Sequence, residues 1–261
     1  MSVFRRTEQT AIETEQMTRA FGMPERKGPT RKHRPKGVVI LYEDRDVLVV
    51  DKLPGLLTVG TEREQSRTAY HALTDYVRKG CAKSRNHVFI VHRLDRDASG
   101  ILIFAKSREA KVCLQDQWKE TEKKYLAVVH GKLARKAGTI TSYLAENKEQ
   151  VVYSTSDTRR GKLSHTAYRV LKETKRFSLL EINLLTGRKN QIRVHLADSG
   201  HPIVGDKKYG QEEKTHKRLA LHARSISFKH PFSGKRLTFE TEIPAYFNEL
   251  VGGIGQEDNP T

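Results

Sequence analysis

The chain contains very little cysteine and no long hydrophobic run. Its two cysteines, Cys81 and Cys113, stand at no metal-ligand spacing, and its eleven histidines are scattered, so we expect neither a disulfide framework nor a bound metal. The longest apolar runs, such as 47–50 and 101–105, have the length of a strand and are too short to span a membrane. Residues 7–16 are polar and acidic, unlike the apolar segment of a signal peptide. These absences predict a cytoplasmic protein.

Acidic residues are also scarce relative to basic ones. The 261 residues include 48 lysines and arginines against 31 carboxylates, which gives a net charge of +17. Such an excess, in a chain without an amphipathic membrane helix, predicts binding to a polyanion such as nucleic acid. The positive charge is concentrated at 26–36, 159–162 and 207–218. One such stretch alone would be consistent with a solvated surface, but the three together with the global excess predict RNA binding.

One segment, residues 91–100 (VHRLDRDASG), combines charge and turn residues between apolar strand-like runs. It places Asp95 between Arg93 and Arg96. Neighbouring guanidinium groups favour the ionised form of a carboxylate, so Asp95 is available as a nucleophile or as a base. The two arginines can bind phosphate groups or stack on bases. Taken alone, the segment is also consistent with a surface salt-bridge cluster.

Further segments follow this one in a recognisable order. They are 123–127 (KKYLA), 186–196 (TGRKNQIRVHL) with 200–206 (GHPIVGD), 221–223 (LHA) and 230–234 (HPFSG). Over about residues 38–247, this order resembles the motifs of the RluA-type pseudouridine synthases, in which the aspartate of His-Arg-Leu-Asp is catalytic. The resemblance implies an isomerase that converts specific uridines of ribosomal or transfer RNA to pseudouridine.

The resemblance also implies roles for three residues. Asp95 is the essential carboxylate, acting either as a nucleophile or as the base that removes the C2′ proton, and the sequence leaves both roles open. Arg193 is the family position that pairs with the aspartate, and Tyr125 lies beneath the uracil ring. No cofactor is expected, because the isomerisation involves no redox change and no net group transfer. The chain also has neither a Walker loop nor a dinucleotide glycine fingerprint.

Several basic residues are expected to contact the RNA. Arg93 is placed to fill the base stack from which the target uridine is extruded. The other expected RNA-binding residues are Arg96, Arg188, Lys189, Arg31, Lys32 and Arg34. Lys189 and Asn190 stand where relatives commonly have threonine or serine followed by histidine, and Ala98 stands where threonine is common. These departures weaken any transfer of target specificity from a particular relative.

The chain divides into three expected regions. Residues 1–36 contain helix-breaking pairs such as Gly28-Pro29 and are interpreted as a flexible basic arm. Residues 37–250 form the catalytic domain, and 251–261 form a flexible tail. Too few residues precede Val38 to hold the S4-type RNA-binding domain that many relatives carry. A monomer is the default expectation.

The pattern over 37–250 predicts an α+β fold with a mixed, largely antiparallel β-sheet and flanking helices; the resemblance implies that the sheet is long and bent. Helices are expected to begin after Ser66, Ser107 and Asn190, whose side chains can cap them, and Gly200 closes the last. The expected strands are 38–42, 47–51, 88–91, 101–105, 125–129, 139–144, 166–171, 177–184, 219–228 and 236–243.

Two other functions fit parts of the sequence. A catalytically silent RNA-binding or ribosome-assembly factor would keep the fold, but it would be favoured only if Asp95 or Arg193 were replaced. A hydrolase of the glycosidic bond would need a second carboxylate as general acid, a role that Asp97 or Asp206 would have to fill. Free uracil among the products would reveal that activity.

Overall fold

The computed structural model of the protein describes residues 34–62, 64–79, 81, 83–210 and 215–253. The expected basic arm, including Arg31 and Lys32, and the expected tail therefore lie almost wholly outside the described residues. Within the described part, no helix is both long enough and apolar enough to cross a membrane.

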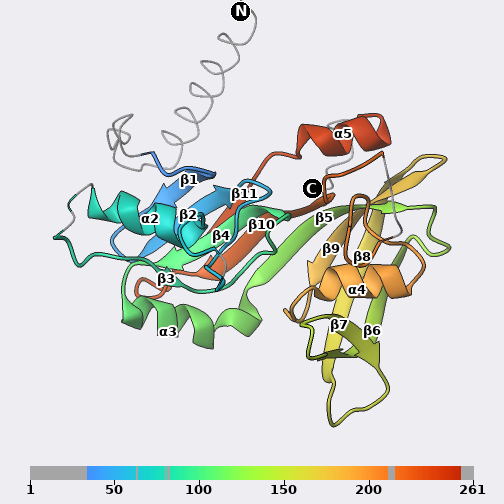
Figure 1. The fold of residues 1–261 in the computed structure, drawn as a ribbon, viewed down its shortest axis with the longest axis horizontal. Helices are drawn as coiled ribbons and strands as arrows, with labels where there is room; N and C mark the ends of the chain where they lie inside the picture. The colour runs from blue at the N-terminus through green and yellow to red at the C-terminus, as the bar shows by residue number, and fades with distance from the viewer. Residues whose placement is uncertain (1–33, 63, 80, 82, 211–214, 254–261) are drawn as a thin grey trace, which may run out of the picture. The chain divides into compact units, whose positions relative to one another are not determined.

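Eleven strands and four α-helices build the described part of the chain (Figure 1). The strands are β1 (Val38–Glu43), β2 (Val47–Lys52), β3 (Phe89–Ile90), β4 (Ser99–Ala105), β5 (Glu122–His130), β6 (Ala137–Glu146), β7 (Val152–Thr155), β8 (Lys162–Glu173), β9 (Phe177–Leu184), β10 (Leu221–Lys229) and β11 (Arg236–Glu240). The helices are α2 (Ala69–Arg78), α3 (Arg108–Asp116), α4 (Gln191–Asp198) and α5 (Ala245–Val251), with a 3-10 turn, η2 (Trp118–Glu120).

All the strands belong to one mixed sheet. Its order is β1-β2-β4-β10-β5-β9-β8-β6-β7, with β11 beside β10 and β3 beside β4. Among the described ladders only β4 and β10 pair in parallel. The expected α+β fold with a largely antiparallel sheet is therefore confirmed. Strand β10 lies between β4 and β5. These two strands are consecutive in the chain but do not pair with each other.

The close pairing of β4 with β10 depends on a glycine. Gly100 has a φ of +109°, and a Cβ atom there would lie 2.3 Å from the carbonyl oxygen of Ala223. Only glycine tolerates both the backbone conformation and this contact. The Ser-Gly pair that ends the segment 91–100 thus allows the strand after Asp95 to pack directly against β10.

Alternating side chains place helices on both faces of the sheet. In β2, Leu48 and Val50 belong to the larger hydrophobic cluster, while Val47 and Val49 belong to a second one. The larger cluster includes residues of α2, α4 and α5, and the second includes Ala110 and Leu114 of α3. Because side chains of a strand alternate between faces, α3 covers the face opposite to the other three helices.

Two helix starts test the expected caps. Ser107 caps α3, since its side chain accepts a hydrogen bond from the backbone N–H of Ala110. The expectation for Ser66 is wrong: Thr68 caps α2 and accepts from the N–H of His71. The helix begins at Ala69, two residues later than expected, and the Ser66 hydroxyl donates to Glu64.

The expected strands and buried positions also needed correction. Strand β7 was missed because its sequence VYST is short and half of it is exposed. The strand expected over 88–91 forms only two ladder residues, and that over 236–243 ends at Glu240. Cys113, within α3, is only partly buried, and its thiol donates to the carbonyl of Pro231.

Candidate active site

Asp95 lies in the loop between β3 and β4, and neighbouring segments hold this loop in place. The hydroxyl of Thr58 donates to the carbonyl of Leu94 over 2.9 Å and accepts from the Leu94 N–H over 3.1 Å. The N–H of Gly55 donates to the carbonyl of Arg96 over 2.9 Å. The backbone on both sides of Asp95 is therefore tied to the segment 53–58, while the Asp95 side chain stays 26% exposed.

A fully buried lysine adds to this support. The Lys52 ammonium donates to the carbonyls of Leu53, Leu56 and Arg96 at 2.9–3.0 Å. An ammonium group has three donors, so these bonds satisfy it completely. Lys52 thus joins the end of β2, the segment after it and the aspartate loop.

The geometry of Lys52 predicts an unusual pH dependence of stability. Burial lowers the pKa of Lys52 to about 8, although Asp97 and Asp95 act to raise it. An unfolded lysine has a pKa of about 10.4, so between about pH 8 and 10 the unfolded chain binds more protons and folding stability rises with pH. We expect the unfolding free energy of wild type, minus that of Lys52→Met, to increase by about 2 kcal/mol over this range. Urea denaturation at several pH values measures it, and a pH-independent difference would contradict the prediction.

Arg193 connects Asp95 to a second carboxylate. Its Nη1 donates to Asp95 Oδ2 over 2.9 Å, while its Nε and Nη2 donate to the two oxygens of Asp206 over 2.8 and 2.7 Å. Burial acts to raise the pKa of Asp206, but the hydrogen bonds from Arg193 and from the N–H groups of Tyr209 and Lys208 lower it overall. Asp206 therefore stays ionised and fixes the guanidinium that faces Asp95.

The turn before α4 places Asn190 on the same carboxylate oxygen. Asn190 occupies the helix start with a φ of 52°, but its side chain makes no capping bond, contrary to expectation. Its Nδ2 instead donates to Asp95 Oδ2 over 2.7 Å, and its Oδ1 accepts from the hydroxyl of Tyr209 over 3.3 Å. The left-handed conformation, which asparagine tolerates well, turns the amide toward Asp95.

A buried glutamine stabilises the turn before α4. The side-chain oxygen of Gln191 accepts from the hydroxyl of Thr186 and from the N–H of Arg188, over 2.9 and 3.0 Å. Its amide donates to the carbonyl of His165 and to the hydroxyl of Thr166 in β8. The glutamine of the segment 186–196 therefore anchors the turn to the sheet, and this helps to fix the direction of Arg193, two residues further along α4.

Tyr125 lies on β5 and is almost fully buried, with 9% of its surface exposed. Burial raises the pKa of the Tyr125 phenol, and the charge of Asp95 raises it further. The phenol is consequently protonated at neutral pH. Asp95, Arg193 and Tyr125 are far apart in the chain. In the fold, Arg193 donates to Asp95, and the charge of Asp95 acts on the Tyr125 phenol.

None of the described basic residues expected to bind RNA has a side chain that donates a hydrogen bond to Asp95, which accepts from Asn190 and Arg193. Arg93, Arg96, Arg188, Lys189 and Arg34 are all exposed. Lys189, one of the two residues that depart from the usual motif, forms an ion pair with Glu146 at the end of β6.

A group of possible metal ligands lies elsewhere. Asp44, Asp46 and His230 place ligand atoms within 4.8 Å of one another. Asp44 accepts hydrogen bonds from two backbone N–H groups and from Tyr42, and it contacts the His230 ring over 2.9 Å. These contacts give the group a structural explanation, as a bridge between the β1–β2 turn and the segment after β10.

Sequence reasoning missed several residues of the site. Lys52 was not considered, Asn190 was interpreted as a cap, and Asp206 was considered only as a possible general acid. Tyr209 was not considered either, yet its ring lies 5.2 Å from the Arg193 guanidinium carbon. For Lys52, the one available signal was a lysine directly between a buried strand and Leu53-Pro54-Gly55.

Comparison with known proteins identifies the family of the chain. A model of the RNA pseudouridylate synthase family matches residues 46–198. An uncharacterized RNA pseudouridine synthase of Bacillus subtilis is 37% identical over 81% of this chain and 70% of its own length. Ribosomal large subunit pseudouridine synthase C of Rickettsia bellii is 33% identical over 81% of this chain and 70% of its own length. The solved structure of human RNA pseudouridylate synthase domain containing 1 is 26% identical and has a TM-score of 0.66, with 84% of this chain and 87% of that chain covered. These matches confirm the resemblance carried by the motifs, and the chain belongs to the RNA pseudouridylate synthase family, whose members isomerise uridine in RNA.

Proposed function

We propose that this chain isomerises specific uridines of ribosomal or transfer RNA, with Asp95 as the essential carboxylate. The observation that carries the proposal is the way Asp95 is held. Arg193 and Asn190 both donate to its Oδ2, and no described residue donates to Oδ1. One oxygen is therefore fixed by charge-assisted hydrogen bonds, and the other is available to a substrate.

The reaction needs little besides this carboxylate. The C1′–N1 bond breaks, the uracil turns over, C5 joins C1′, and the proton from C5 is replaced by one on N1. Oδ1 of Asp95 is suited either to attack C1′ or to remove the C2′ proton. Tyr125 supplies a protonated phenol beside Asp95, and we propose that its ring supports the uracil.

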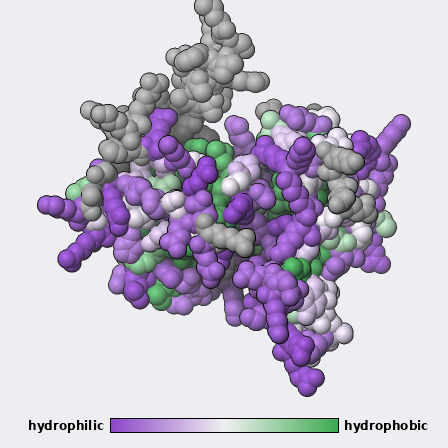
Figure 2. Space-filling view, in the orientation of Figure 1, coloured by the Kyte–Doolittle hydropathy of each residue, from purple (hydrophilic) through white to green (hydrophobic). Residues whose placement is uncertain are grey.

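The RNA class is the finer part of the proposal. The Rickettsia relative is named for the large ribosomal subunit, and this name favours ribosomal RNA as the substrate, with transfer RNA as the alternative. We propose that the exposed side chains of Arg93, Arg96, Arg188 and Lys189 contact the RNA backbone or bases. The visible face in Figure 2 is largely hydrophilic, as expected for a surface that meets a charged and hydrated partner. The monomeric state and the cytoplasmic location stay predictions.

Removing residues 1–36 should weaken RNA binding and flatten its salt dependence. Within this segment, the stretch 26–36 contributes basic residues at 26, 27, 31, 32, 34 and 36. For each lysine or arginine that no longer binds a phosphate, the slope of log K against log salt should decrease in magnitude by roughly 0.7–0.9. Binding titrations at several salt concentrations, with full-length and shortened chains, measure this. An unchanged slope would exclude the arm as an RNA-binding segment.

Asn190→Ala should lower kcat about tenfold or more while KM changes little. The substitution removes one of the two hydrogen bonds on Asp95 Oδ2, and bonds to charged groups contribute roughly 1.5–3 kcal/mol. The matched control is Asn183→Ala, because Asn183 is an exposed asparagine on β9. An equal loss in both variants, or a rise in KM alone, would argue that Asn190 does not position Asp95.

Pseudouridine mapping across the RNA of the host tests the proposed function directly. Cells with and without the gene are compared, and the deletion is complemented with wild type or with Asp95→Ala. A site that is lost on deletion, restored by wild type and not restored by the variant identifies the substrate. If no site were lost, the catalytically silent RNA-binding factor would become the better proposal.

A further inference from the structure

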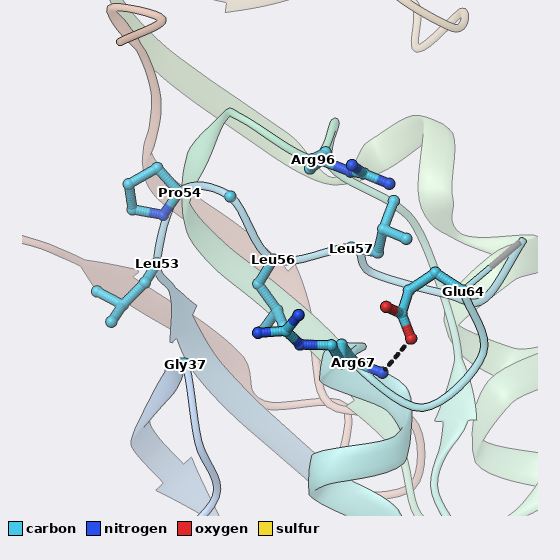
Figure 3. A pocket seen from close by; sticks show the side chains of 9 residues that line it. Gly37, Leu53, Pro54, Leu56, Leu57, Glu64, Arg67 and Arg96 are labelled. Carbon is cyan, nitrogen blue, oxygen red and sulfur yellow. Dashed lines mark hydrogen bonds between the residues drawn. The ribbon is translucent and has the colours of Figure 1, made fainter.

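A pocket of about 490 Å³ lies next to the aspartate loop (Figure 3). Its lining consists of Gly37, Leu53, Pro54, Gly55, Leu56, Leu57, Glu64, Arg67 and Arg96. Arg96 follows Asp95 directly in the chain, and Gly37 directly follows the basic stretch 26–36. Through Arg96, the pocket therefore adjoins the loop that carries Asp95.

The lining combines three kinds of chemistry. The apolar part of the lining includes Leu53, Leu56 and Leu57, and Leu53 is 49% exposed. The guanidinium groups of Arg67 and Arg96 are exposed, and neither forms an ion pair within 4 Å with a carboxylate of the described residues. Glu64 adds a carboxylate at the pocket edge (Figure 3).

The Glu64 carboxylate is held with one oxygen available. Its Oε1 accepts from the N–H of Arg67 over 3.0 Å and from the hydroxyl of Ser66 over 3.1 Å. These hydrogen bonds, that of Arg67 first, lower the pKa of Glu64, so the group is ionised at neutral pH. No described residue donates to Oε2, which can therefore accept a hydrogen bond from a ligand.

We propose that this pocket binds an unpaired nucleotide of the RNA near the target uridine, and that it prefers guanine, adenine or cytosine to uracil. The volume lies in the range of small-molecule sites. Guanidinium groups suit phosphate oxygens and base faces, and unpaired bases are recognised by stacking and by their edges. A carboxylate accepts from the amino group that these three bases carry. Uracil has no amino group, and its one edge donor, N3–H, lies between two carbonyl oxygens that repel a carboxylate.

The inference rests on the proposed function, because it assumes that RNA is the ligand. An acidic peptide is a poorer fit, since the Glu64 carboxylate would repel it. The pocket would thus add base selectivity close to Asp95, at a site separate from the hydrogen-bond network of Arg193 and Asn190.

Short RNA probes on the full chain test the proposal. Fluorescein-labelled UUUUU is compared by anisotropy with UUGUU, UUAUU and UUCUU, and the leucine methyl resonances are followed by NMR. We expect at least one amino-bearing probe to bind about tenfold more tightly than UUUUU and to shift the resonances of Leu53, Leu56 or Leu57. Glu64→Gln should reduce this ratio to below about twofold, while Glu62→Gln, which changes an exposed carboxylate outside the pocket lining, should leave it unchanged.

Three results would overturn the inference: equal affinity of wild type for all four probes, unperturbed leucine resonances, or an equal ratio in wild type and Glu64→Gln. Its failure is distinguishable from failure of the proposed function. Asp95-dependent pseudouridine formation without base preference would refute only the proposal about the pocket. A base preference that depends on Glu64, without any Asp95-dependent pseudouridine formation, would refute only the proposed function.

Discussion

Replacement of Asp95 by alanine is expected to abolish pseudouridine formation, lowering kcat by about 10⁴-fold or more, while RNA affinity changes little. The loss is large because both candidate mechanisms use this carboxylate, and no other described carboxylate accepts hydrogen bonds from both Arg193 and Asn190. Affinity persists because phosphate contacts dominate RNA binding. Tritium release from RNA labelled at C5 of uridine measures turnover, and filter binding measures affinity.

A neighbouring aspartate provides the control for this variant. Asp97 is exposed and lies two residues from Asp95. Asp97→Ala should keep most of the activity. Turnover retained in Asp95→Ala would refute the proposed role of that residue. Free uracil in the wild-type reaction, absent with Asp97→Ala, would instead favour the hydrolase.

Asp206→Ala should combine a large loss of stability with loss of activity. The Asp206 side chain is only 1% exposed and that of Arg193 only 12%, so removing the carboxylate leaves a largely buried cation with one of its two partners. Breaking a buried ion pair in this way costs roughly 3–5 kcal/mol. Released from Asp206, the guanidinium also ceases to be fixed against Asp95, so kcat should fall even in the molecules that remain folded.

Urea denaturation and tritium release measure the two effects separately. Asp206→Asn is the informative companion, because an amide keeps the shape and can still accept from the N–H groups of Tyr209 and Lys208. We expect this variant to fold and to show reduced kcat. Asp116→Ala, at an exposed position of α3, should change stability by less than about 0.5 kcal/mol. Full activity of Asp206→Asn would show that the second carboxylate serves stability only.

The two Asp206 variants also bear on the origin of the site's rigidity. Asp95 receives its two hydrogen bonds from one turn and one helix, and both depend on further side chains, Tyr209 and Asp206. A carboxylate that must act at one atom of a sugar benefits from such support, because misplacement by about 1 Å can cost 10²-fold in rate.

Local sequence determined much of the fold and the identity of the carboxylate. Apolar runs of strand length predicted strands such as β2 and β9 nearly to the residue, and Ser107 predicted the start of α3. These features depend on neighbours within a few positions, so a linear pattern records them. The charged segment around Asp95, with its companion motifs, likewise sufficed to indicate the family.

Only the tertiary structure decided which groups meet Asp95. Asn190 and Arg193 lie 95 and 98 residues away in the chain, and Asn190 looked like an ordinary helix cap. Lys52 was not considered, because the sequence does not show that carbonyls of the segment after β2 and of the aspartate loop accept its three hydrogen bonds. These contacts arise from the sheet order, in which β10 lies between β4 and β5 and β9 follows β5, and from backbone turns such as that of Asn190. Pairings of this range depend on which strands become neighbours, and that choice is made by the packing of the whole sheet and not by any local run of residues.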